Sequence, residues 1–309
     1  MISSDQYRKE INWKKSSYRK GKDRAVRVLG YTAFGFLFVI LASIFAYVLH
    51  GGATTVTWKI LTTNGNTSYG GIANAIWGTW ELVGMGLLFS LPPGLFGAIY
   101  LTQSTSNRKL SGTMRLFTDT LTSVPSIVIG LFGYLVLVIR LNWGYSILAG
   151  GFALAVMMLP YIMRISELSF RSISREQVQN AYALGASHIN VTTKIYLPQA
   201  SAGIFAGVLL AVSIAAGETA QLIYTAGFGF QLPGAFTHSQ VGYLTYMIWT
   251  GINQPSTYSH NIAFISAMVL ILSITTLIFI SKYEGSIIRV LRKVFVETPP
   301  EKEKAKDKR

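Results

Sequence analysis

The chain has 309 residues, of which half are hydrophobic and only 13% are charged, and the apolar residues cluster in long runs. This composition excludes an ordinary soluble domain and makes a membrane protein the leading class. Because cysteine is absent, disulfides, thiolate metal sites and cysteine nucleophiles are excluded as well.

The net charge of +14 could indicate nucleic-acid binding, but the distribution of the basic residues argues against it. Of the 27 Lys and Arg residues, nine fall in residues 1–27, nine in 281–309, three in 101–119 and four in 164–200. The positive-inside rule produces this asymmetry when both termini and two loops are cytosolic. We therefore expect an even number of crossings of the cell membrane, with the lipid bilayer and no nucleic acid as a partner.

Six transmembrane helices are expected in chain order. The first run has 22 residues without a charge, enough at about 1.5 Å per residue to cross a hydrocarbon core of roughly 30 Å. We expect it to stay in the mature protein, because it is longer than a signal-peptide core. The spans are Val28–Leu49, Ile72–Tyr100 with a kink at Pro92-Pro93, Leu116–Ile139, Tyr145–Met163, Ala202–Tyr224 and Ile262–Ile280.

The remaining segments complete an all-α, polytopic organisation. The expected parts are a basic cytosolic segment 1–27, a membrane domain 28–280 containing a cytosolic loop at 164–200, and a basic cytosolic tail 281–309. The tail from Pro299 onward is too polar to bury a core, so disorder is expected there. An apolar, aromatic patch at Val241–Ile252 is too short to span and is expected to be re-entrant or interfacial.

The main cytosolic face is expected at Gln177–Ala200, which combines a helix-compatible block at Val178–Leu184 with a helix breaker at Gly185. A Leu197-Pro198 pair is expected to stop the next regular run, because proline lacks a backbone donor. These features predict a short helix, a turn and a second break between two spans.

This loop resembles the EAA loop of ABC-importer permeases. Gly185, nine further residues and then Ile195, Leu197 and Pro198 reproduce the signature G-x9-I-x-LP, while Gln179-Asn180-Ala181 replaces the opening Glu-Ala-Ala. The resemblance implies a permease fold of six transmembrane helices whose loop couples the membrane domain to a separate cytosolic ATPase.

Four further motifs narrow the resemblance to phosphate-importer permeases of the PstA type. Two positions differ from that pattern, since Ile214 replaces an Arg and Gln221 replaces a Pro. The resemblance implies a second, PstC-like permease, a dimer of the ATPase, which uses the ATP, an external phosphate-binding protein, and no cofactor on this chain. The motifs are Gly70–Ala75, Val124–Phe132, Met158–Arg164 and Gly217–Ala220.

Three charged residues are candidates for the translocation pathway. Glu218 is expected about 16 residues and roughly 24 Å into the fifth span, where a carboxylate is costly unless it faces a cavity or a partner. Arg164 and Glu167 are three apart on one helical face, and an Arg and a Glu implicated in transport occupy this place in the family. Their ion pair is expected to be the switchable element. The simpler alternatives are a protonated, helix-orienting Glu218 and an Arg164 that only anchors a span end.

Gly203 and Gly207 form a small-residue face expected to allow close helix packing. No P-loop, H-E-x-x-H motif, G-x-S-x-G elbow or Cys/His cluster is present in the sequence, so no catalytic residue and no metal site is expected. Three alternatives stay open: an importer of another oxyanion such as sulfate or molybdate, a gradient-driven secondary carrier, and a membrane scaffold. A carrier predicts inverted repeats instead of an EAA loop, and a scaffold leaves Glu218 unexplained.

Overall fold

The computed structural model describes residues 4–65, 70–103, 108–230, 232 and 234–296, with side chains described only between 22 and 280 and not at position 108. Within this part the chain forms helices and no strand, which confirms the all-α fold class. The segment from Pro299, where disorder is expected, lies outside the described residues. The chain divides at Thr54/Thr55 into two units, which are described separately.

The first unit is helix α1, Ser4–Thr55. Within Lys22–Thr55 the most apolar window of 18 residues has a mean hydropathy of 2.3, and consecutive apolar residues such as Phe36, Leu37, Phe38 and Val39 place apolar side chains on every face. A helix that is apolar on every face is stable where its surroundings are lipid or another apolar helix. The expected first span therefore lies inside α1.

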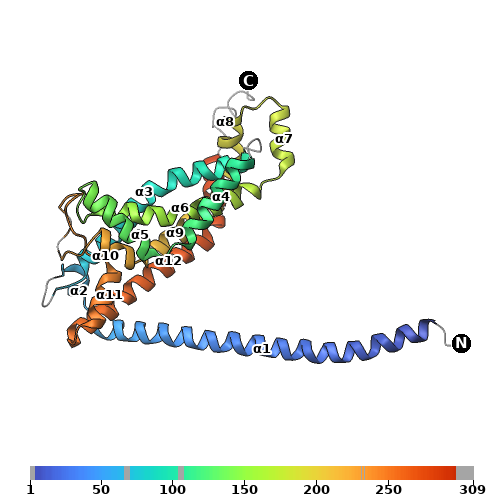
Figure 1. Cartoon of the computed structure of the whole chain (residues 1–309), viewed down its shortest axis with the longest axis horizontal. Coiled ribbons are helices and arrows are strands. Elements are labelled where there is room, and N and C mark those ends of the chain that lie inside the picture. Colours follow the sequence, from blue (N-terminus) through green and yellow to red (C-terminus); the bar gives the residue numbers. More distant parts are fainter. Residues whose placement is uncertain (1–3, 66–69, 104–107, 231, 233, 297–309) are drawn as a thin grey trace, which may run out of the picture. The chain divides into compact units, whose positions relative to one another are not determined.

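The second unit is a helical bundle that contains the described elements from α2 to α12 (Figure 1). Two segments have π-helical geometry and are labelled η. In chain order the elements are α2 Trp58–Thr62, α3 Ala73–Gln103, α4 Arg108–Ser123, α5 Ser126–Gly133, η1 Tyr134–Arg140, α6 Ile147–Arg171, α7 Arg175–Ala183, α8 His188–Val191, η2 Thr192–Tyr196, α9 Leu197–Ala216, α10 Ala220–Thr225, α11 Leu244–Asn253 and α12 Thr257–Val296.

Five of the described helices are long and apolar enough to cross a membrane, and the number becomes six if a bent pair is counted as one span. That pair is the expected third span, which bends by 98° between α4 and α5. Pro125 lies at the bend, where it removes a backbone donor and disfavours helical geometry for Val124. By contrast, α3 continues through Pro92 and Pro93 without interruption.

The C-terminal end predicted for the fifth span is wrong. Helix α9 stops at Ala216 instead of continuing to Tyr224, and α10 begins only at Ala220. Gly217, a poor helix former, caps α9, and Thr219 has φ −122° and ψ −50°. Glu218 therefore lies in a break between two helices and not in the middle of a continuous one.

The short helix α11 corresponds to the expected non-spanning patch. Its 10 residues span only about 15 Å, half of what a crossing requires. Tyr246 of α11 and the N-cap residue Tyr243 pack with Phe228, whose ring stacks on Tyr246 at a centroid distance of 4.3 Å. This end of the bundle is thus held by aromatic packing.

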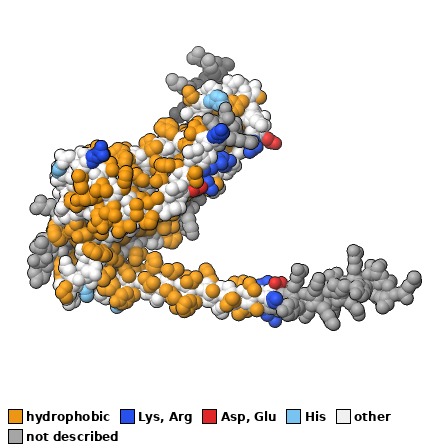
Figure 2. Space-filling model, viewed as in Figure 1, with side chains coloured by type: hydrophobic (Ala, Val, Ile, Leu, Met, Phe, Trp, Pro, Cys, Tyr) orange, Lys and Arg blue, Asp and Glu red, His pale blue; other side chains and the backbone are white. Residues whose placement is uncertain are grey.

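Small residues let the central helices α3, α6 and α9 approach closely. A Cβ atom added to Gly151 of α6 would lie 2.5 Å from Met85 of α3. On α9, a Cβ atom at Gly203 would lie 2.2 Å from the Ser169 hydroxyl oxygen and one at Gly207 would lie 2.8 Å from Ile165. Both α9 glycines thus lie against α6. Figure 2 shows hydrophobic side chains over much of the visible side of this unit, as expected of a surface that faces lipid.

Candidate functional site

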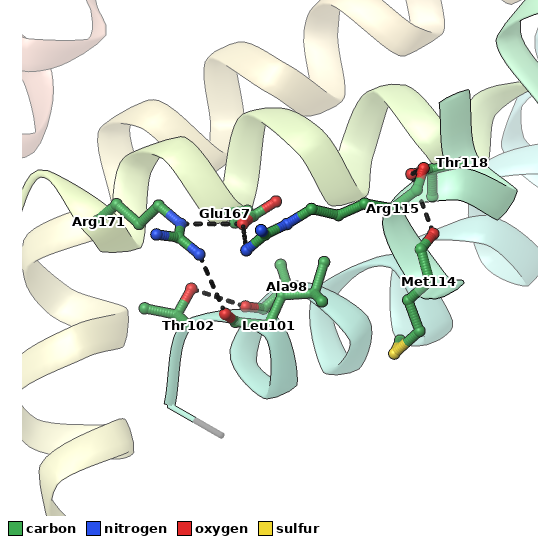
Figure 3. Close-up of polar contacts among 8 residues, drawn as sticks. All are labelled: Ala98, Leu101, Thr102, Met114, Arg115, Thr118, Glu167 and Arg171. Atoms are coloured by element: carbon green, nitrogen blue, oxygen red, sulfur yellow. Dashed lines mark hydrogen bonds and ion pairs between the residues drawn. The ribbon is translucent and has the colours of Figure 1, made fainter. Parts of the chain in front are cut away.

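Glu167 forms the centre of a charged cluster near the C-terminal end of α6 (Figure 3). Its side chain is only 5% exposed, and Oε1 accepts hydrogen bonds from Arg115 Nη2 at 2.8 Å and Arg171 Nε at 2.9 Å. Arg171 also donates through Nη2 to the backbone oxygen of Leu101 at 3.3 Å. The cluster therefore connects α4, α6 and the last turn of α3.

Charge pairing stabilises the arrangement of these three side chains. A carboxylate this deeply buried is stable only when it is paired, and two guanidinium groups satisfy one of its oxygens. The Leu101 carbonyl is one of the last four of α3, which have no intrahelical partner and carry the negative end of the helix dipole. The positive charge of Arg171 compensates the negative end of the α3 dipole. The cluster keeps one net positive charge, with Arg115 38% and Arg171 46% exposed.

The ion pair expected between Arg164 and Glu167 does not form. Arg164 is exposed and has no acidic partner among the described residues, and it lies on the same exposed stripe of α6 as Leu168. Glu167 instead points toward α4, where Arg115 reaches it. The i, i+4 spacing of Glu167 and Arg171 is a signal that could have identified one true partner. Arg115 is 52 residues away in sequence, so no local pattern identifies it.

Glu218 lies half-buried in the break between α9 and α10. Its backbone oxygen accepts a hydrogen bond from the Thr245 hydroxyl at 2.7 Å, which ties the break to α11. Its carboxyl group lies beside the Ser126 side chain at the start of α5. No Lys or Arg among the described residues pairs with it. In contrast to Glu167, this carboxylate therefore lacks a resident counter-charge.

The two interrupted spans meet at this point. A Cβ atom at Gly130 of α5 would lie 2.5 Å from the Cα atom of Gln221 in α10, and one at Gly133 would lie 2.8 Å from Thr225. Gln221 is fully buried, its Nε2 lies 3.8 Å from Met157 Sδ, and its Oε1 has no hydrogen-bond partner. The bend before α5 and the break before α10 thus face each other in the bundle interior, with Ser126 and Glu218 between them.

Residues 172–191, called the projecting loop below, leave the bundle between α6 and η2 (Figure 1). Helix α7 has no buried residue. It ends at Ala183 and is followed by Gly185, whose φ of +81° is left-handed. Gly185 N donates to Tyr182 O at 2.9 Å and Ala186 N donates to Ala181 O at 3.0 Å. This pair of bonds is a Schellman motif, in which glycine avoids a steric penalty.

A second set of contacts fixes the turn after Gly185. The Ser187 side chain accepts from Asn190 N and caps α8, and the Tyr182 hydroxyl lies 2.9 Å from His188 Nδ1. The projecting loop thus has a defined shape while its surface stays free. Leu184 is 88% exposed, which is unusual for so apolar a side chain.

The stop expected at Leu197-Pro198 is wrong. Helix α9 begins at Leu197, and Pro198 occupies its first turn, where a missing N–H costs nothing. Of the other loop residues singled out from the sequence, Gln179 and Asn180 are exposed and Ala181 is half-buried in α7, while Ile195 is half-buried in η2. Among the described residues, no group of three or more His, Asp and Glu side chains could hold a metal ion.

Five or six apolar spans among the described residues, with a break inside the bundle of the second unit and an ordered projecting loop, define a multi-pass membrane protein with the architecture of a transporter permease. Solved structures agree in fold. A bacterial alginate ABC transporter matches with a TM-score of 0.61 at 13% identity, covering 90% of this chain and 96% of that chain. The inward-facing MetNI methionine ABC transporter matches with a TM-score of 0.52 at 19% identity, covering 71% and 93%.

The chain belongs to the family described as binding-protein-dependent transport system inner membrane component, whose model matches residues 91–283. It is 38% identical over 226 residues to the phosphate transport system permease protein PstA 2 of Mycobacterium bovis, covering 73% of this chain and 75% of that protein. It is 34% identical over 219 residues to PstA of Yersinia pestis, covering 70% and 74%. It is therefore a permease component and not itself an enzyme, and such an importer also contains a partner permease, an ATPase and a binding protein.

Proposed function

We propose that this chain is the PstA-type permease subunit of an ATP-driven importer of inorganic phosphate. The observation that carries the proposal is the projecting loop, a solvent-exposed helix and turn of fixed shape in a chain that is 38% identical to a phosphate permease. A fixed, exposed loop is suited to docking on a partner, because little conformational entropy is lost on binding.

The partners in this proposal are a PstC-like second permease, a dimer of cytosolic ATPase subunits and an external phosphate-binding protein. The ATPase uses ATP, and this chain binds no cofactor. Both termini and the projecting loop lie in the cytosol, and the spans cross the cell membrane six times. The basic residues concentrated at both ends of the sequence support this orientation.

The translocation pathway in the proposal runs between the two permeases, past Glu218 and Arg164. Exposed Arg164 on α6 attracts the anion near the cytosolic end, and Glu218 orients or gates the pathway where the two broken spans meet. An unpaired carboxylate repels an anion, so Glu218 must move or be protonated for phosphate to pass. Closure of the ATPases moves the projecting loop and thereby changes which side is open.

Phosphate is proposed in preference to sulfate or molybdate because relatives at 38% and 34% identity carry the phosphate name. The test is ATP hydrolysis and uptake by the complex, purified with its partners and reconstituted in liposomes. Phosphate should stimulate hydrolysis and accumulate, whereas sulfate and molybdate should not. Stimulation by either of those anions without phosphate uptake would reject the assignment.

The docking of the projecting loop is tested separately by disulfide crosslinking, since the chain has no native cysteine. Ala183 and Ser187 are exposed, so Ala183→Cys and Ser187→Cys should crosslink to cysteines introduced on the ATPase. Lys59→Cys on α2, which is also exposed, is the matched control on the proposed outer side. An assembled complex that crosslinks only through position 59 would contradict both the docking and the orientation.

A further inference from the structure

The last turn of α3 contacts both roots of the projecting loop. At the entry root, Arg171, the final residue of α6, donates to Leu101 O at 3.3 Å. At the exit root, Gln103 Nε2 donates to the hydroxyl oxygen of Thr192, the first residue of η2, at 2.7 Å. A single helix end is thus hydrogen-bonded to the loop where it leaves the bundle and where it returns.

The contact at Thr192 continues into the loop itself. The Thr192 hydroxyl accepts from Gln103 and donates to His188 O at 2.8 Å, and His188 lies against Tyr182 of α7. The polar chain therefore runs from α3 through η2 and α8 to α7. Because the Thr192 hydroxyl accepts one of these hydrogen bonds and donates the other, replacing Thr192 removes two bonds at once.

A small apolar cluster surrounds the same place. Leu101 of α3, Phe170 of α6 and Ala200 of α9 are buried together there, and Phe170 packs edge-on against Tyr196 at a centroid distance of 5.9 Å. Close-packed interiors transmit displacement and have few intermediate arrangements. This cluster prevents the loop roots from sliding past α3 without repacking.

Arg171 also connects the entry root of the projecting loop to α4. Arg171, which holds Leu101 O, also shares Glu167 with Arg115 of α4. By contrast, α7 has no buried residue, so the side-chain hydrogen bonds at the roots are a main attachment of the loop to the bundle. Movement imposed on the loop therefore reaches α3 and α4 through Gln103, Thr192 and Arg171.

We propose that Gln103, Thr192 and Arg171 are positioning residues that make the projecting loop, α3 and α4 move as one body during the transport cycle. This inference rests on the proposed function, in which the ATPase moves the loop. Without these contacts the loop would still dock, and ATP would still be hydrolysed, but its movement would be transmitted less completely to α3. The expected consequence is uncoupling of hydrolysis from transport.

The test uses the assembled complex with spin labels on Ala183→Cys in α7 and Phe96→Cys in α3, both of which are exposed positions. The distance between the labels should be the same in the nucleotide-free state and in the ATP-trapped state. Thr192→Val keeps the side-chain shape and removes the hydroxyl, so the distance should then differ between the two states. Thr192→Ser keeps the hydroxyl and should behave as the native chain.

The same variants are compared for phosphate taken up per ATP hydrolysed. Loss of one hydrogen bond, here the one between Gln103 and Thr192, changes the ratio of coupled to uncoupled complexes by about fivefold. The amount of phosphate taken up per ATP should therefore fall about fivefold in Thr192→Val and recover in Thr192→Ser. Gln103→Met, which removes the donor at similar volume, should reproduce Thr192→Val and replaces it if that variant does not assemble.

The outcomes separate this inference from the proposed function. If the native complex takes up no phosphate, the proposed substrate is rejected, and the label distances still decide whether the loop and α3 move together. A native complex whose label distance changes between the two states overturns the inference, even when phosphate uptake is normal. Equal uptake ratios in Thr192→Val, Gln103→Met and the native complex overturn it as well.

Discussion

The two buried or half-buried carboxylates of the second unit have opposite surroundings. Glu167, near the C-terminal end of α6, is 5% exposed and is shared by two arginines within 2.9 Å. Glu218, in the break between α9 and α10, has Ser126 beside it and no cation among the described residues. A paired carboxylate at a helix junction stabilises an arrangement, whereas an unpaired one in a helix break carries a cost that packing must offset.

We therefore expect the two carboxylates to act differently in transport. The negative charge of Glu167 is compensated by Arg115 of α4 and Arg171 of α6, and the pairs hold these helices together. The carboxylate of Glu218 has no cationic partner among the described residues, and the backbone around it is not held in a regular helix. A group that must change its contacts during transport is better placed at such a break, because fewer native bonds have to be broken there.

The largest effect on transport is expected from Glu218→Gln, which tests the difference between the two carboxylates. Because the proposed gate depends on a change in the charge or position of Glu218, a side chain that is always neutral should no longer close the pathway behind the anion. Net phosphate uptake should therefore fall by about tenfold or more, equivalent to about 1.4 kcal/mol. The melting temperature of the purified complex should not fall, because no ion pair is lost. Glu81→Gln, at an exposed acid on α3, is the matched control and should leave uptake unchanged. Normal uptake in Glu218→Gln would reject its pathway role.

Arg164→Ala tests the expectation that this residue acts on the anion and not through Glu167. Uptake should again fall by about tenfold, with unchanged melting, because the structure gives the Arg164 charge no acidic partner to lose. Arg140→Ala, at an exposed arginine ending η1, is the control. A drop in melting temperature with Arg164→Ala would show that Arg164 stabilises the fold, and would contradict the expectation that it acts on the anion.

Much of the fold follows from local sequence patterns. Apolar runs and the placement of Lys and Arg predicted the number and approximate positions of the spans, because bilayer thickness limits the length of each helix. Gly185 was predictable as a turn since a left-handed residue after a helix favours glycine. The break at Gly217–Thr219 was missed, because the apolar residues on both sides are equally compatible with one continuous span.

The partners within the candidate site were harder to predict. Arg164 and Glu167 have a spacing that permits a pair on an isolated helix, but the tertiary structure presents Arg115 to the same carboxylate from α4. Gln103 and Thr192 are 89 residues apart, and neither belongs to a recognisable motif. Contacts between distant segments depend on how helices pack, and a single sequence contains no direct signal for them.

Glu167→Gln tests the other half of the comparison. Two arginines would lose their shared counter-charge, so the free energy of unfolding should fall by about 2 kcal/mol, less than for a fully buried pair because both guanidinium groups are partly exposed. The measurement is thermal melting of the reconstituted complex. Any loss of phosphate uptake should be proportional to the loss of folded complex. An unchanged melting temperature together with lost uptake would assign Glu167 to the pathway and remove the distinction from Glu218.

The smallest expected effects are those of the arginines taken singly. Arg115→Met or Arg171→Met leaves Glu167 with one partner and retains the apolar stem, so each should cost about 1 kcal/mol or less. Removing both leaves a buried carboxylate without a cation, and the loss should exceed the sum of the two. A double-mutant cycle on the melting transition measures this excess. Strict additivity would mean that the two arginines contribute independently and that Glu167 does not link α4 to the last turn of α3.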